Sequence, residues 1–225
     1  MKKNHVKKLT TCAVLIPMSV LLSFITLFHS PLGGSLTLFS MLPITLIGYL
    51  YGAKWGFGSA FVYAILQIAI SPSTVSALFL PGEAQEVWWK AILICFLDYI
   101  LAYTVLGFSS LFRSESHPAR SLVSGTVVAI LFRYLIHLIS GALFYGAWAE
   151  WYFENFGNVI SESNPSTFLS GLGTSILNNM SGAGLPVLYS AIYNGIYMIP
   201  EMVLTGIAAF IIGKIPYITK QADYL

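Results

Sequence analysis

The sequence has 225 residues, of which 56% are hydrophobic and 9% are charged, and its formal net charge is +2. Soluble domains carry about 25% charged residues, so this composition and a mean hydropathy of +0.77 exclude an ordinary soluble protein. Cys12 and Cys95 both lie in apolar runs and provide neither a disulfide framework nor metal-ligand spacing. We therefore expect residues 1–225 to form a single integral membrane domain.

The basic start of the chain, MKKNHVKKLT, leads into an apolar run that reaches Phe28. A cleaved signal peptide is the alternative, but a run of about 20 residues is longer than a usual signal core, and no A-x-A site closes it. A retained first transmembrane helix is therefore expected.

Six apolar segments approach or reach the length of about 20 residues that a helix needs to cross a bilayer. Their approximate ranges are 9–28, 36–52, 56–71, 88–111, 121–145 and 186–213. Because lipid does not tolerate open sheet edges, all six are predicted to be helices. The sequence thus predicts an all-α, polytopic bundle of six transmembrane helices.

The basic residues are distributed unevenly between the two sides of this bundle. Nine of the eleven fall on one side, namely Lys2, Lys3, Lys7, Lys8, Lys54, Arg113, Arg120, Lys214 and Lys220. The loops on the other side carry the acidic residues Glu83, Glu86, Glu150, Glu154 and Glu162. By the positive-inside rule, both termini are predicted to be cytoplasmic.

The outer loop 146–185 is far longer than a typical connection. Its first part, Trp148 to Phe156, is aromatic and acidic and suits the membrane surface. Its second part, Ser166 to Gly184, is rich in Gly, Ser and Asn. The segment is either a flexible outer loop or a lid over an outward-facing site, and both interpretations stay open.

Few ionisable side chains remain within the spans: Asp98, Arg133, His137 and Glu201. Such residues face the bundle interior or a cavity and mark function by default. Counted from the outer helix ends, Asp98, Arg133, His137 and Asn194 lie about 12 to 18 Å deep. A shared polar layer in the outer half of the bundle predicts a pocket that opens outward.

Helical spacing places Arg133, His137, Gly141 and Tyr145 on one stripe of the fifth segment. Gly141 would let a flat group approach the backbone. Tyrosines adjoin the other polar residues, namely Tyr99 beside Asp98, and Tyr189, Tyr193 and Tyr197 around Asn194. A carboxylate among aromatic rings suits a cationic, planar ligand, because ring faces attract cations.

Structural explanations compete with this interpretation. Asp98 and Arg133 could form an ion pair between helices, His137 could be a hydrogen-bonded core residue, and the tyrosines could belong to an interfacial belt. Glu201 follows Pro200 and could cap a kink or face a partner subunit, so it receives no role.

Enzymatic signatures are missing from the sequence. It has no G-x-x-x-x-G-K-[ST] nucleotide loop and neither an H-E-x-x-H nor a G-x-S-x-G motif. An intramembrane hydrolase that uses Ser175 and His137 is a remaining alternative, although Ser175 is expected in a flexible loop.

Four segments, in this order, make the chain resemble the thiamine-specific S component of energy-coupling factor (ECF) transporters. They are Gly33-Gly34-Ser35, Leu97-Asp98-Tyr99, Arg133-Tyr134 through Gly141, and Tyr189 through Tyr197 (YSAIYNGIY). The resemblance covers nearly all of the chain except the loop 146–185. An S component for another small heterocyclic vitamin is the alternative, because such proteins share the fold and differ in the pocket.

The resemblance implies a multi-pass subunit of the cell membrane that captures thiamine from outside. It would associate with a transmembrane T component and two cytoplasmic ATPase subunits, without a cofactor, a nucleic-acid partner or catalysis of its own. The substrate-binding positions that it implies are Trp88, Asp98, Tyr99, Arg133, His137, Gly141, Tyr145, Tyr189 and Asn194. Arg133 and His137 would form a polar wall facing Asp98, with Arg133 keeping that carboxylate ionised.

The sequence also departs from the family pattern. Asp98 stands where the acid can be Glu, and Arg133 stands where the base can be Lys. An aromatic residue of the first outer loop is replaced by Gly33-Gly34. The small-xxx-small motif that docks the T component remains only as Ala13 to Pro17, so the docking residues are less well defined than the binding site.

Overall fold

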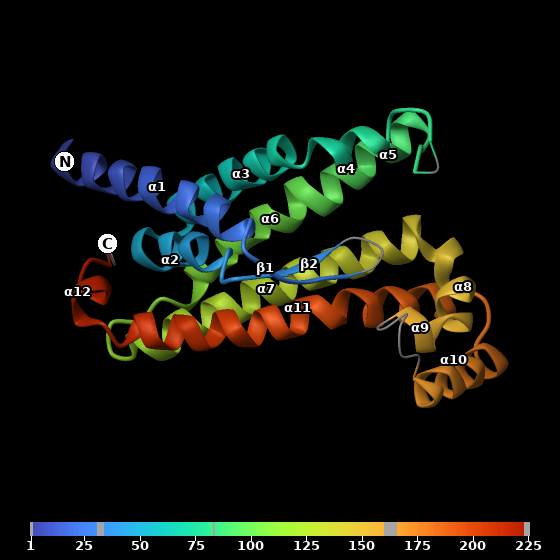
Figure 1. Ribbon diagram of the computed structural model, residues 1–225. Helices are drawn as coiled ribbons and strands as arrows, with labels where there is room; N and C mark the ends of the chain where they lie inside the picture. Colours follow the sequence, from blue (N-terminus) through green and yellow to red (C-terminus); the bar gives the residue numbers. More distant parts are fainter. Residues whose placement is uncertain (1, 31–33, 83, 160–165, 223–225) are drawn as a thin grey trace.

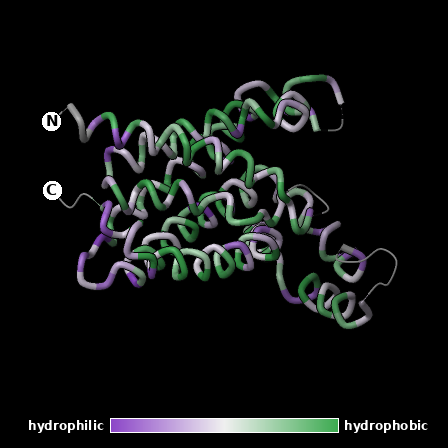
Figure 2. Tube along the Cα trace, turned by 60° about the vertical axis from the view of Figure 1, so that its left-hand side comes forward, coloured by the Kyte–Doolittle hydropathy of each residue, from purple (hydrophilic) through white to green (hydrophobic). Residues whose placement is uncertain are grey.

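The computed structural model describes residues 2–30, 34–82, 84–159 and 166–222, and Gly33, Glu83 and Glu162 lie outside them. Long helices lie side by side in an elongated bundle, with both chain ends at one end and α8, α9 and α10 at the other (Figure 1). Apolar residues dominate the middle of the long helices, while hydrophilic ones gather near the ends of the bundle (Figure 2). This arrangement is that of an all-α, polytopic membrane protein.

The first membrane segment is shorter than the sequence predicts. Helix α1 (Lys2–Ser23) ends before Phe28, and strands β1 (Thr26–His29) and β2 (Ser35–Thr37) follow it as an antiparallel hairpin. The prediction of helix in this part of segments 9–28 and 36–52 is therefore wrong. The two strands pair with one another and β2 packs against α11, whereas Leu27, Phe28 and His29 of β1 are exposed.

The second segment forms only a short helix, α2 (Leu42–Tyr51), all ten residues of which are buried. At 1.5 Å per residue it spans about 15 Å, roughly half of a hydrocarbon core. Gly52, with φ of +81°, turns the chain into α3 (Ala53–Ile70), and α4 (Pro72–Ala77) follows. The guanidinium of Arg113 covers the end of α2 by donating to the carbonyls of Tyr49 and Leu50 at 2.7 and 3.1 Å.

The fourth segment changes its winding along its length. It runs through α5 (Trp88–Cys95), the π-helical η1 (Phe96–Leu101), α6 (Ala102–Thr104) and the 3₁₀-helical η2 (Val105–Phe112). The two longest helices, α7 (Pro118–Phe144) and α11 (Gly184–Gly213), pack along one another. The described residues include five helices long and apolar enough to span a membrane, with α2 as a shorter apolar helix, so a count of six spans stays a prediction.

The described part of the segment 146–185 is folded. It contains η3 (Gly146–Trp148), α8 (Ala149–Glu154), α9 (Phe156–Val159) and α10 (Thr167–Asn179), and α12 (Pro216–Thr219) closes the chain at the other end. Ser166 caps α10 by accepting from the Leu169 backbone N–H at 3.3 Å. The expectation of a flexible loop is therefore wrong for these residues, while the lid interpretation stays a prediction.

Candidate functional site

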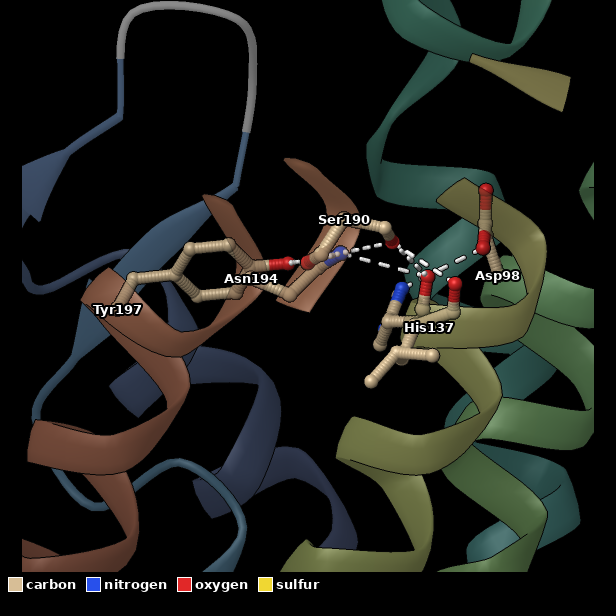
Figure 3. A network of polar contacts seen from close by, with 6 residues as sticks. Asp98, His137, Ser190, Asn194 and Tyr197 are labelled. Carbon is tan, nitrogen blue, oxygen red and sulfur yellow. Dashed lines mark hydrogen bonds and ion pairs between the residues drawn. The ribbon is translucent and has the colours of Figure 1, made fainter. Parts of the chain in front are cut away.

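Side chains from three helices form a polar network in the bundle (Figure 3). Asp98 comes from η1, His137 from α7, and Ser190, Asn194 and Tyr197 from α11. The Nδ1 atom of His137 lies 3.3 Å from a carboxylate oxygen of Asp98. Because η1 is π-helical, Asp98 sits in a local irregularity of the kind often found at functional sites.

Asn194 links this pair to the rest of α11. Its Nδ2 donates to the Ser190 and His137 carbonyls at 2.9 and 3.3 Å, and its Oδ1 accepts from the Tyr197 hydroxyl at 2.6 Å. The Ser190 hydroxyl donates to the Leu138 carbonyl at 2.8 Å. The bonds from Asn194 and Ser190 to the His137 and Leu138 carbonyls hold α7 and α11 in one register, while the buried Nε2 atom of His137 has no hydrogen-bond partner among the described residues.

Gly141 of α7 lies against Ser190 and Asn194 of α11. A Cβ atom at this position would lie 2.2 Å from Ser190 Oγ and 3.3 Å from Asn194 Nδ2. The Cβ position of Gly141 is thus filled by α11, and the glycine permits the helix contact that carries the network. Its backbone is partly exposed, and the approach of a flat ligand to it stays a prediction.

Arg133 forms a second polar group, one helical turn from His137. Its guanidinium carbon lies 4.2 Å from the centre of the Tyr103 ring, and its Nη1 lies 2.9 Å from Met41 Sδ. Glu201 is among the groups that interact with it electrostatically. The expected ion pair between Arg133 and Asp98 is absent from the described ion pairs, because Asp98 pairs with His137 and Arg133 is enclosed by Tyr103 and Met41.

Glu201, to which the sequence assigns no role, is only 2% exposed. It accepts hydrogen bonds from the hydroxyls of Thr37 on β2 and of Ser40, the latter at 3.4 Å. Gly34 brings the hairpin against the same helix, with φ of +75° and with no space for a Cβ, which would lie 2.6 Å from the Tyr197 ring. Glu201 therefore anchors the hairpin within this chain, and the idea that it faces a partner subunit is wrong for this structure.

An aromatic cluster lies toward the α8 end of the site. The Tyr189 and Tyr193 rings stack at 5.8 Å, and Tyr152 packs edge-on against both at 5.0 and 6.2 Å. Tyr152 is fully buried, whereas Trp148 and Trp151 are exposed, and the assignment of this segment to the membrane surface stays a prediction. Burial raises the pKa of the Tyr152 hydroxyl, which keeps the ring neutral.

The structure brings most of the predicted site residues together. Tyr145 packs against both the Tyr152 cluster and the cluster of Leu78, Ala91 and Ile94, and it interacts electrostatically with Asp98. Tyr99 lies next to Asp98 on η1 and is partly buried. Trp88 is 69% exposed at the start of α5 and belongs to neither cluster.

Sequence reasoning missed Tyr152 and Ser190, and it noticed Glu201 without assigning it a role. The periodicity of the last segment contains a signal for Ser190, which precedes Asn194 by one helical turn and so shares its face. Tyr152 gave no such signal, because its burial depends on the fold of the outer segment. The hydrolase alternative finds no support in the geometry, because Ser175 is exposed on α10 and His137 Nδ1 faces Asp98.

Comparison with known proteins relates this chain to transport. The model of the family described as Thiamine transporter protein (Thia_YuaJ) matches residues 9–152, more than half of the chain. The chain belongs to this thiamine transporter family. The resemblance noted in the sequence is thereby confirmed, and family membership points to a transporter rather than to an enzyme.

Individual relatives of this family agree with the assignment. The Thiamine transporter ThiT of Bacillus subtilis (strain 168) is 28% identical over 219 residues, which cover 92% of this chain and 90% of that protein. The structure of ThiT from Listeria monocytogenes matches with a TM-score of 0.63 at 20% identity, over 96% of this chain and 98% of that one. The latter likeness supports the fold, and together the findings place this family member in the cell membrane as a multi-pass protein.

Proposed function

We propose that the chain captures thiamine from the outside as the S component of an ECF-type importer. The observation that carries the proposal is the Asp98 carboxylate, paired with His137 and adjoined by Tyr99 and Tyr145, in a member of the thiamine transporter family. The Asp98 and His137 side chains keep 18% and 14% of their surface exposed, so the pair is not sealed in the core.

Each part of the site matches one part of thiamine chemically. The thiazolium ring carries a fixed positive charge, which a carboxylate neutralises and which aromatic ring faces attract. Asp98 would supply the carboxylate, while Tyr99 and Tyr145 would supply rings. His137 would hydrogen-bond the pyrimidine or hold Asp98 in place, since one of its nitrogens already faces that carboxylate.

Delivery of the vitamin would depend on partners. The sequence has no G-x-x-x-x-G-K-[ST] loop, so the chain offers no such site for ATP. We infer that a transmembrane T component and two cytoplasmic ATPase subunits supply the energy. In proteoliposomes, uptake of labelled thiamine should then require these partners and internal ATP. Accumulation by the purified chain alone on a proton or sodium gradient would contradict the proposal.

The ligand itself is tested by gentle purification from cells grown with thiamine, followed by mass spectrometry of the intact complex. One bound thiamine per chain is expected. Riboflavin or biotin in its place would favour the S component of another vitamin. An empty protein that also fails to bind added thiamine would refute the proposal.

A further inference from the structure

A separate concave region lies at the end of the bundle that holds both chain ends. A hollow of about 740 Å³ is lined by residues of the first turn of α7, the last turn of α11 and α12. These three elements lie together at the end of the bundle that holds both chain ends (Figure 1). The distribution of basic residues predicts that this end faces the cytoplasm. The hollow contains none of the residues of the Asp98 network.

Positive charge dominates the lining of this hollow. Arg120 lines it from α7, and Lys214 and Lys220 line it directly after the ends of α11 and α12, while Glu115 is the one acidic residue among its described lining residues. No ion pair joins these three cations to a carboxylate in the described parts of the chain. The Lys214 ammonium instead lies 4.5 Å from the centre of the Phe210 ring. The hollow therefore offers cations to an external anion.

The base of the hollow is tightly packed. A Cβ on Gly213 would lie 2.5 Å from the Ala119 Cα, so α11 and α7 meet here backbone to backbone. Thr219 of α12 is buried at the edge and donates to the Ile215 carbonyl at 3.3 Å. These contacts fix the three elements that carry the cations, so the charges converge on one place.

An exposed apolar face of α11 lies beside the hollow, which Phe210 and Lys214 line. Val203, Ile207 and Ile211 follow a spacing of four residues and are 53%, 55% and 59% exposed. Ile211 precedes Lys214 by three residues, which places both on one side of the helix. An apolar stripe that ends at a group of cations matches the two parts of a phospholipid, whereas a free anion would use only the cations.

We propose that this hollow binds the phosphate of an anionic phospholipid headgroup, with the acyl chains along Val203, Ile207 and Ile211. Basic pockets between membrane helices on the cytoplasmic side bind anionic headgroups for the same electrostatic reason. Arg120, Lys214 and Lys220 would contact the phosphate. The site is independent of thiamine capture.

The test is native mass spectrometry of the delipidated full chain with phosphatidylglycerol and, separately, phosphatidylcholine of equal chain length. The variant R120Q/K214Q removes two cations of the hollow. K7Q/K54Q is the matched control, since both residues are exposed and on the side predicted to be cytoplasmic. We expect R120Q/K214Q to weaken phosphatidylglycerol binding roughly tenfold to thirtyfold, at about one kcal/mol per cation. K7Q/K54Q and the unmodified chain should bind phosphatidylglycerol equally strongly. Both should bind phosphatidylglycerol more strongly than phosphatidylcholine.

The remaining outcomes are equally informative. Equal losses in both double variants, or no loss in R120Q/K214Q, would overturn the proposal. At the same concentration as the lipid, inorganic phosphate should neither displace phosphatidylglycerol nor raise the melting temperature of the protein. If phosphate raises the melting temperature as much as phosphatidylglycerol does, the hollow binds a free anion. If R120Q/K214Q does not fold, K220Q alone should still weaken phosphatidylglycerol binding severalfold, and unchanged binding there would count against the site.

Discussion

The Nδ1 atom of His137 and a carboxylate oxygen of Asp98 lie 3.3 Å apart and join the π-helical η1 to α7. This pairing separates Asp98 from Arg133, which is enclosed by Tyr103 and Met41. The Asp98 side chain keeps 18% of its surface exposed, so the carboxylate is accessible to a cationic ligand beside His137.

The first prediction concerns Asp98→Asn, which preserves shape and removes the charge. Loss of one partner of a buried charge pair costs on the order of 2–5 kcal/mol, or roughly 30- to 5000-fold in affinity. We expect such a loss for thiamine and a small one for an analogue whose thiazolium is replaced by an uncharged ring. Isothermal titration of both ligands measures the difference.

Glu150→Gln is the control for this measurement, because Glu150 is an exposed carboxylate on α8. It should leave both affinities unchanged. If Asp98→Asn instead reduces the affinity for both ligands equally and lowers the melting temperature of the ligand-free protein, then Asp98 stabilises the fold rather than binding the cation.

The second prediction concerns the helix contact at Gly141. Alanine there would place a Cβ 2.2 Å from Ser190 Oγ, so α7 and α11 must separate or Ser190 must rotate. Overpacking of this kind costs about 1–3 kcal/mol, and thermal unfolding in detergent should show the loss. Gly171→Ala on α10 meets nothing within 4 Å and should be neutral or slightly stabilising. Equal melting temperatures for the two variants would contradict this account.

The third prediction concerns Glu201 and Arg133, which interact electrostatically inside the bundle. Glu201→Gln keeps the shape but leaves the buried guanidinium without this negative charge. Breaking a buried pair costs about 3–5 kcal/mol, and we expect about 3 because the two groups are not in direct contact. Chemical unfolding of the single and double variants is the measurement.

A double-mutant cycle with Arg133→Met separates this pairing from the hairpin contact. If the charges act on each other, the double variant should lose less stability than the sum of the single ones, by about 0.5–3 kcal/mol. If the losses in unfolding free energy are strictly additive, Glu201 stabilises the protein only through its hydrogen bonds with Thr37 and Ser40.

The fourth prediction concerns Tyr152, which attaches α8 to α11 through Tyr189 and Tyr193. Truncation to alanine removes a fully buried ring and should cost about 3–5 kcal/mol. Limited proteolysis should then cut the segment 146–185 faster. Tyr152→Phe is the control and should behave like the unmodified chain, because the described residues offer no hydrogen-bond partner to this hydroxyl. Faster cleavage of the Phe variant would show that the hydroxyl matters.

Much of the architecture follows from the sequence, because a bilayer requires long apolar helices and separates basic from acidic loops. Five of the six predicted segments contain a long apolar helix. The second does not, because its first residues form strand β2 of a hairpin that docks on α11, and only Leu42–Tyr51 form helix α2. An apolar stretch of this length can thus form a strand or a helix. Local hydropathy cannot distinguish these two solutions.

The sequence by itself determined which polar residues enter the membrane, since Asp98, Arg133, His137 and Asn194 are visible against apolar runs. Only the tertiary structure decided their partners. Helical rise gives depth, but the rotation of each helix sets which groups meet, and the π-helical turn at Asp98 changes that rotation. Asp98 therefore contacts His137. Arg133 instead contacts Tyr103 and interacts electrostatically with Glu201. Packing between helices, rather than spacing along them, selects the contacts of a buried charge.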